Sequence, residues 1–320
     1  MLVDLFTNPN ETILDPFSGV GTIPFEACAM SRRGIGSDIN PVAYYVTRAK
    51  VNPPPWDTVK IQIKELETYI IKNRNNPESI PEEEIVDYYH PATLKEIISA
   101  RDFFLSHREE NLSFLMSCTL HILHGNRPYS LSRRSHNIMP WPPKGEAVYK
   151  PLIKHVREKG YRMLRSGLPI NFVQGRAFES DALKLPLSDE SIDAIITSPP
   201  FHNNRDFIRM NRIRLWFAGW DYSTQASMKS RFVENSKNIN IYEDIFDEFH
   251  RVLLPHGLSI LHLGVIGNFD MAREILPLAE KKGFESFTPI YEDTTDMESQ
   301  GIMDRGATSK HQFLIIRKVA

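Results

Sequence analysis

The sequence has little net charge and almost no cysteine. Its 320 residues carry a formal charge of −2 at pH 7, so the chain as a whole has no bulk attraction to nucleic acid. Cys28 and Cys118 lie in apolar, helix-like surroundings without a partner at metal-ligand spacing, which predicts buried thiols in a reducing compartment. His121 and His124 have apolar neighbours, which favours a packed or cleft-lining role, and we expect no metal site.

Long apolar runs, internal repeats and low-complexity tracts are also missing. Met1 leads directly into the first predicted helix and strand, without the pattern of a signal peptide. No stretch of about 20 apolar residues predicts a membrane span. We therefore expect a cytoplasmic protein with no membrane partner, long enough to bury a large core in one domain or two.

Residues 12–22 predict a strand, a glycine-rich turn and the beginning of a helix. The apolar run that opens the segment is typical of a buried parallel strand, and it ends at Asp15. Gly19 and Gly21 allow a tight turn and a close approach of a ligand to the backbone. A second short strand ends at Asp38, where a carboxylate can accept both hydroxyls of a ribose. This order predicts a cofactor site at the carboxyl end of the first strand.

A third glycine, which would complete a nicotinamide-type G-x-G-x-x-G pattern, is absent. Asp15 precedes the loop directly, and its carboxylate would repel a pyrophosphate. The same carboxylate would attract the amino and sulfonium groups of S-adenosylmethionine. The residues therefore favour a cofactor of that charge over a dinucleotide.

A second motif follows another predicted buried strand, at 191–197. Pro199 and Pro200 make a stiff turn in which two backbone donors are missing, so the turn holds its acceptors in fixed positions. The Ser198 side chain and the Pro199 carbonyl could hold both N–H groups of an exocyclic amine and rotate it toward a methyl donor. Phe201 could stack on a base that has left the duplex.

The strings D-P-F-S-G-V-G-T (15–22) and T-S-P-P-F (197–201) together resemble the S-adenosylmethionine-dependent DNA amino-methyltransferases. The T-S-P-P-F form is similar to the cytosine-N4 branch, with adenine N6 as the next substrate. Phe201 stands where tyrosine is more usual. The resemblance implies catalytic roles for Ser198, Pro199, Pro200 and Phe201. It implies that the cofactor is bound by Asp15, Pro16, Phe17, Gly19, Gly21, Thr22, Asp38, Ile39, Asn40, Asp181 and Ala182.

The resemblance also implies an α/β fold with a doubly wound, mostly parallel sheet, Rossmann-like, that ends in an antiparallel hairpin. We predict a catalytic domain from residues 1–51 and 171–320. A mainly helical insert at 52–170, with helical patterns at 59–72, 93–106 and 112–124, is a possible DNA-recognition region. Members of the family usually have a helix before the cofactor strand, for which only residues 1–7 are available here.

Basic residues gather in two stretches despite the neutral total. Residues 127–165 hold ten Lys or Arg against two Glu, whereas residues 78–110 hold nine acids against three bases. The second basic stretch, 202–238, follows the proline motif and includes arginines at spacings that share one helix face. Arginine, histidine and aromatic residues suit contacts with phosphates and bases. We predict nucleic-acid contacts at Arg133, Arg134, His136, Arg205, Arg209 and Arg212.

The sequence predicts methyl transfer to double-stranded DNA with a flipped base and, as a further partner, a cognate restriction or defence enzyme. Two alternatives stay open: an RNA base amino-methyltransferase, and a non-catalytic nucleic-acid-binding protein that retains the fold.

Overall fold

The computed structural model of the chain describes residues 2–136, 139–200, 207–233, 239–293 and 308–319. Phe201 and Arg205, two of the predicted site residues, lie outside this described part. The chain forms two compact units. The first comprises Met1–Thr47, Pro169–Arg205 and Ser230–Ala320, and the second comprises Arg48–Leu168 and Asp206–Lys229.

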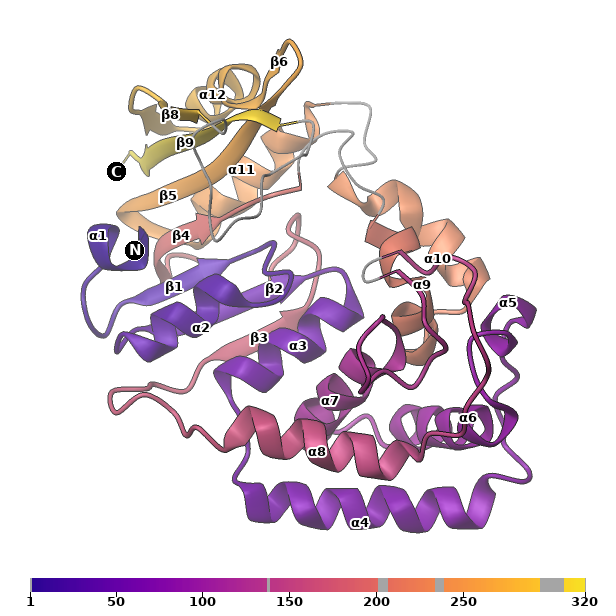
Figure 1. Ribbon diagram of the computed structural model, residues 1–320. Helices are drawn as coiled ribbons and strands as arrows, with labels where there is room; N and C mark the ends of the chain where they lie inside the picture. Colours follow the sequence, from indigo (N-terminus) through magenta and orange to yellow (C-terminus); the bar gives the residue numbers. More distant parts are fainter. Residues whose placement is uncertain (1, 137–138, 201–206, 234–238, 294–307, 320) are drawn as a thin grey trace. The chain divides into compact units, whose positions relative to one another are not determined.

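The first unit is built on one sheet of nine strands among the described residues, in the order β3-β2-β1-β4-β5-β9-β7, with β6 beside β5 and β8 beside β9 (Figure 1). The strands are β1 (Thr12–Asp15), β2 (Arg33–Asp38), β3 (Arg176–Glu179), β4 (Ile192–Thr197), β5 (Leu253–Ile266), β6 (Phe269–Asp270), β7 (Phe284–Ser286), β8 (Ile290–Asp293) and β9 (Thr308–Lys318). Strands β1 to β5 pair in parallel with their neighbours in this order, and every pairing of β6, β7, β8 and β9 is antiparallel.

Helices cover both faces of this sheet, as alternation along the strands requires. Leu14, Ile195 and Leu261 pack with α11 (Ile241–Val252) and α12 (Met271–Lys281) on one face. Ile13 and Ile196, from the alternate positions, pack with α1 (Leu2–Phe6) and α2 (Thr22–Ala29) on the other. The fold class predicted from the sequence, a doubly wound and mostly parallel sheet, is confirmed.

The predicted terminal hairpin is present in a modified form. Both β7 and β8 pair antiparallel with β9. The long strand β9 also pairs with β5 over most of its length, so it lies between β5 and β7. The helix before β1 exists as the five residues of α1, whose Val3 is fully buried.

The second unit is helical. Its helices are α4 (Trp56–Asn73), α5 (Glu83–Val86), α6 (Pro91–Ser106), α7 (Ser113–Leu123), α8 (Leu152–Leu164), α9 (Phe207–Phe217) and α10 (Tyr222–Met228), with a 3-10 turn η1 at Glu110–Leu112. A second such turn, η2 (Lys229–Arg231), and α3 (Pro41–Val51) lie where the chain passes from one unit to the other. Trp216 and Phe217 of α9 are fully buried, because α9 packs on α7. The sequence prediction left residues 206–229 in the catalytic domain, whereas their contacts place them in the second unit.

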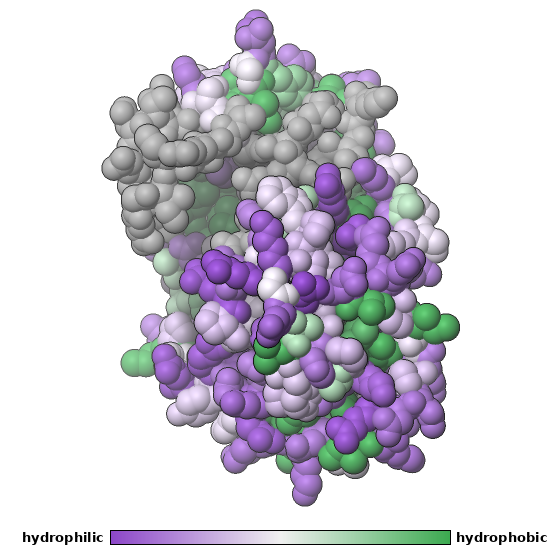
Figure 2. Space-filling view, turned by 45° about the vertical axis from the view of Figure 1, so that its right-hand side comes forward, coloured by the Kyte–Doolittle hydropathy of each residue, from purple (hydrophilic) through white to green (hydrophobic). Residues whose placement is uncertain are grey.

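No helix in the described ranges is both long and apolar enough to cross a membrane. Figure 2 shows hydrophilic side chains over most of the described surface on the face that it presents, with smaller hydrophobic patches among them. Cys28 and Cys118 are buried free thiols, as predicted, and burial raises the pKa of Cys28 to about 11.

Candidate functional site

The two sequence motifs meet at neighbouring strand ends of the first unit. From β1 the chain proceeds through β2 and β3 to one side, whereas β4 and β5 lie on the other side. The order of the strands therefore reverses between β1 and β4, which is where doubly wound sheets bind ligands. The Thr197 hydroxyl donates a 2.6 Å hydrogen bond to Asp15 Oδ1 and joins the two motifs directly.

Asp15 is a buried carboxyl group with few partners. Besides Thr197, the backbone N–H of Phe17 donates to its Oδ1 at 3.2 Å. Burial raises the pKa of Asp15 to about 7, although these two hydrogen bonds lower it, and the nearby Asp38 carboxyl adds a smaller upward contribution. A cationic group beside Asp15 would replace part of the lost solvation and restore the charged form.

The glycine loop between β1 and α2 owes its shape to two left-handed residues. Gly21 has φ 71°, and a Cβ there would lie 2.7 Å from Thr47 Oγ1, so the loop can pack on α3 only without a side chain. Gly19 has φ 49°, and the atom nearest to an added Cβ would be 4.0 Å away. An added Cβ would therefore make only an ordinary contact there, and the left-handed φ is what favours glycine at this position.

Asp38, at the end of β2, holds the glycine loop in place. Its Oδ2 accepts from Gly19 N at 2.9 Å, and its Oδ1 accepts from Asn40 N at 2.9 Å. Burial raises the pKa of Asp38 to about 6. Because each carboxylate oxygen can accept more than one hydrogen bond, both remain able to accept from ribose hydroxyls.

Asp181, in the loop after β3, forms an ion pair with Arg231 at 2.9 Å and accepts from Leu183 N at 3.0 Å. A base amine at this position would share the carboxylate with Arg231. Ala182 beside it is buried. The other predicted cofactor residues lie in the same two turns: Pro16 and Phe17 after β1, Thr22 at the first position of α2, and Ile39 and Asn40 after β2. Asn40 is buried and its Oδ1 accepts from Val42 N at the start of α3.

The proline motif places one exposed hydroxyl beside two histidines. Ser198 is exposed and follows the last residue of β4, whereas Pro199 is buried and Pro200 half-buried. Ser198 Oγ lies 3.4 Å from Nδ1 of His262 on β5, and His262 Nε2 lies 3.1 Å from Nδ1 of His311 on β9. Sequence analysis missed both histidines, because they come from distant strands and carry no local motif.

The predicted nucleic-acid residues of the second unit divide into two kinds. Arg133 donates to the carbonyls of Gly145 and Asp87 at 2.9 and 3.0 Å, so its side chain ties a loop together. Arg134 is exposed, and its carbonyl accepts from Lys144 N at 2.8 Å. The two neighbouring arginines, for which the sequence predicted the same role, therefore differ: Arg133 holds a loop and Arg134 is exposed.

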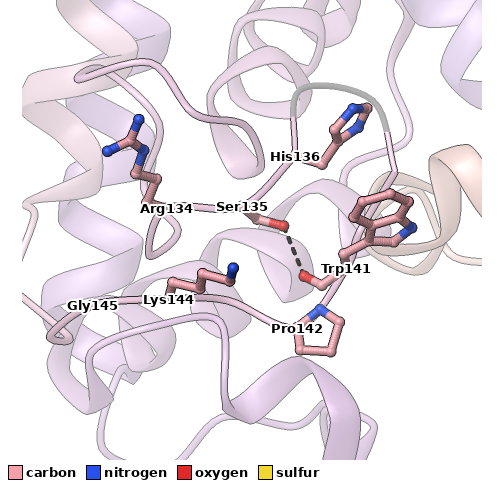
Figure 3. A pocket seen from close by; sticks show the side chains of 7 residues that line it. All are labelled: Arg134, Ser135, His136, Trp141, Pro142, Lys144 and Gly145. Atoms are coloured by element: carbon pink, nitrogen blue, oxygen red, sulfur yellow. Dashed lines mark hydrogen bonds between the residues drawn. The ribbon is translucent and has the colours of Figure 1, made fainter.

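An open pocket of about 770 Å³ lies beside Arg134, and Figure 3 shows its lining. The lining residues are Arg134, Ser135, His136, Trp141, Pro142, Lys144 and Gly145. The rings of His136 and Trp141 have centroids 5.0 Å apart, and Ser135 Oγ donates to the Trp141 carbonyl at 2.7 Å. The site thus combines two cationic side chains with aromatic surface.

On α9, Arg209 is exposed, but Arg212 is half-buried and forms a 2.5 Å ion pair with Glu84. Its guanidinium also lies 5.2 Å from the centre of the Tyr222 ring. The acidic stretch seen in the sequence therefore neutralises one of the predicted nucleic-acid contacts. Among the described residues no three His, Cys, Asp or Glu side chains gather as a metal would require.

The doubly wound sheet, the glycine turn after β1 and the acid after β2 form the layout in which Rossmann-like folds bind a ribose-containing cofactor. Residues 1–49 match the family model N6_N4_Mtase, described as DNA methylase. The Type II methyltransferase M.BsoBI of Geobacillus stearothermophilus is 23% identical over 302 residues, which cover 81% of this chain and 57% of that enzyme. Residues 1–49 are therefore similar to the DNA methylases of this family model, and the chain spans a little over half the length of the curated relative that it matches.

Solved structures are more distant. A TehB-like S-adenosylmethionine-dependent methyltransferase from Corynebacterium glutamicum has a TM-score of 0.39 and 11% identity, covering 99% of this chain and 85% of its own. An S-adenosylmethionine-dependent methyltransferase from Methanosarcina mazei has a TM-score of 0.40 and 10% identity, covering 99% and 97%. At this distance neither structure indicates a substrate for this chain.

Proposed function

We propose that this chain transfers the methyl group of S-adenosylmethionine to an exocyclic amino group of a DNA base, cytosine N4 before adenine N6. The observation that carries the proposal is the Thr197–Asp15 hydrogen bond of 2.6 Å, which joins the cofactor turn to the proline motif. Donor and acceptor groups of a transfer reaction must be held within a few ångströms of each other, and this contact supports such an arrangement.

The cofactor, when bound, supplies a methyl group on a sulfonium, which is already an activated electrophile. Asp15 would attract its cationic groups, and Asp38 would accept hydrogen bonds from the ribose. The backbone of Gly19 lies beside Asp38, to whose Oδ2 its N–H donates at 2.9 Å. The buried state of the Asp15 carboxyl group favours a cationic ligand, because an uncompensated charge there is costly.

The proline motif would orient the amine. The lone pair of an exocyclic nitrogen is delocalised into the ring, so the amine attacks well only after it is rotated. Ser198 Oγ and the Pro199 carbonyl can accept the two N–H groups from fixed positions, because the two prolines stiffen the turn. We assign to Phe201 the stacking of the flipped base.

The pocket beside Arg134 supports a nucleic-acid contact in the second unit. Arg134 and Lys144 are exposed cations that suit a phosphate, and Trp141 offers an aromatic face for an unstacked base. The loop that carries them is fixed by Arg133 and by the Tyr88 hydroxyl, which donates to the Trp141 carbonyl at 2.9 Å. DNA contacts at this loop and at Arg205 and Arg209 of the second basic stretch belong to the proposal, as does a restriction or defence partner.

The deciding experiment is mass spectrometry of nucleosides. Purified protein is incubated with unmethylated genomic DNA, total RNA and isotopically labelled S-adenosylmethionine, and the digested nucleic acids are analysed for label. We expect labelled N4-methylcytosine in DNA. Labelled N6-methyladenine would correct the base and keep the mechanism, whereas label in RNA alone would replace DNA as the substrate. Cofactor binding by calorimetry without any transfer would favour the non-catalytic binder.

A further inference from the structure

Three side chains form a chain of contacts on one face of the sheet at its carboxyl-terminal edge. In the register of β4 and β5, Thr197 lies opposite Leu261, so Ser198 and His262 are the next residues along each strand. On β9, Phe313 lies opposite His262, and His311 is two residues earlier, so its side chain points to the same face. The His262 ring stacks on Phe313 at 5.1 Å between centroids and is thereby held in one plane.

The directions of the hydrogen bonds along this chain decide what Ser198 can do. If His262 Nε2–H donates to His311 Nδ1 at 3.1 Å, then His262 Nδ1 carries no proton and can accept from the Ser198 hydroxyl. The hydroxyl proton is then directed toward His262, and the lone pairs of Oγ are available to an amine N–H. In the opposite arrangement His262 donates to Ser198, and the hydroxyl proton would face the amine.

The His262 ring is suited to the accepting role. Burial, assisted by the neighbouring His311, lowers the pKa of His262 to about 4, so the ring is neutral near pH 7. The Ser198–His262 distance of 3.4 Å is at the outer limit of a hydrogen bond. Contacts of this kind commonly shorten when substrate binds.

We infer that His262 is a positioning residue for the methyl acceptor: held by His311 and Phe313, its Nδ1 accepts a hydrogen bond from the Ser198 hydroxyl and so leaves the lone pairs of Ser198 Oγ to accept from the target amine. This inference rests on the proposed function, because it names the group that prepares Ser198 for its role. His262 itself touches neither cofactor nor substrate in this scheme.

A pair of substitutions at His262 tests the inference by activity. His262→Phe keeps the aromatic contact with Phe313 and removes the acceptor, and we expect kcat to fall up to about 100-fold with little change in the KM for cofactor. His262→Asn places an amide oxygen near the position of Nδ1 and should restore most of the activity. Equal losses in the two variants, both with wild-type melting temperatures, would overturn the inference.

A double-mutant cycle separates positioning from packing. If His262 acts through the Ser198 hydroxyl, His262→Phe should add no further loss of kcat in a Ser198→Ala background. Losses that multiply would show that the two side chains act independently and would also contradict the inference.

A spectroscopic measurement needs no methyl acceptor. Nitrogen-15 NMR of the full chain at neutral pH should show His262 with Nε2 protonated and Nδ1 unprotonated, its signal assigned by loss in His262→Phe, and Ser198→Ala should shift the Nδ1 resonance. A protonated Nδ1 overturns the inference whatever the enzyme does. If the expected tautomer is found but no nucleic acid is methylated, the proposed function fails while the Ser198–His262 contact holds.

Discussion

The two units place their functional side chains on different kinds of structure. In the first unit Asp15, Asp38 and Ser198 stand at the ends of paired strands, and each has a hydrogen-bonding partner from another element. In the second unit Arg133, Arg134 and His136 stand on an irregular loop, and Arg209 and Arg212 stand on α9. Two of these arginines are already engaged, Arg133 with carbonyls and Arg212 with Glu84. Groups that take part in chemistry need fixed geometry, whereas groups that contact a nucleic acid need exposure.

The largest expected effect tests the catalytic side of this contrast. Ser198→Ala removes one acceptor for the amine, and kcat should fall about 100- to 1000-fold, the usual loss when one group that stabilises a transition state is deleted. Cofactor affinity by calorimetry should stay at the wild-type value. The matched control is Ser191→Ala, at the other end of β4, whose exposed hydroxyl donates to Ser188 O. A variant that keeps full activity would remove Ser198 from the mechanism.

Asp38→Asn tests the proposed role of Asp38 in cofactor binding beside the glycine loop. The amide keeps the size of the side chain but loses an acceptor for ribose and for Gly19 N, and we expect cofactor to bind about 10- to 100-fold more weakly, since a hydrogen bond to a charged group contributes about 1.5–3 kcal/mol. Calorimetry with S-adenosylmethionine measures this loss. Glu179→Gln, in register with Asp38 on β3 and exposed, is the control and should bind as wild type. Equal affinities for all three proteins would contradict the assignment.

Arg133 and Arg134 test the contrast inside the second unit, because substitution of the first should lower stability and substitution of the second should weaken DNA binding. Arg133→Ala should cost about 1–3 kcal/mol of unfolding free energy, since it leaves the carbonyls of Gly145 and Asp87 without their donors. Arg134→Ala should leave the melting temperature nearly unchanged, weaken DNA binding several-fold and reduce the salt dependence of binding by about one counterion. Thermal denaturation and binding titrations at several salt concentrations measure both. The reverse pattern would show that Arg133 is the nucleic-acid contact.

The smallest expected effect is a pH dependence of stability and of cofactor affinity that comes from the titration of Asp15. Its folded-state pKa of about 7 lies above the value of about 4 in an unfolded chain, so the folded protein without cofactor holds the proton more tightly. Its stability contribution is therefore present at low pH and is lost as pH rises from about 4 through about 7. The cationic cofactor prefers the charged carboxylate, so we expect affinity to rise a few-fold between about pH 6 and pH 8.

The matched variant for this measurement is Asp15→Asn, whose side chain does not titrate. Its cofactor affinity should be weaker than that of the wild type at high pH, and it should vary less between the two pH values. If the wild type and Asp15→Asn respond to pH alike, the dependence comes from another group. Calorimetry of both proteins in the same buffers decides this.

Most of the first unit could be predicted from local sequence. The apolar run before Asp15, the glycines and the run before the proline motif predicted β1, the turn and β4, because buried parallel strands have continuous apolar segments. The helical patterns of the insert correspond to α4, α6 and α7. Helix α8 was not predicted, although its buried residues Leu152, Val156 and Gly160 recur at helical spacing. The assignment of α9 to the second unit depends on burial of Trp216 and Phe217 against other helices.

The sequence by itself determined the strands β1 and β4, the glycine turn and the position of the Ser-Pro-Pro motif, because each follows from apolar runs and turn residues close together in the chain. The doubly wound sheet was expected from the resemblance that these motifs carry. Only the tertiary structure decided which of the polar groups meet. The Thr197–Asp15 contact joins residues 182 positions apart. His262 lies beside Ser198 because β4 pairs with β5, and His311 lies beside His262 because β5 pairs with β9. Strand pairing depends on the packing of the whole sheet, so no local pattern in the sequence could predict it.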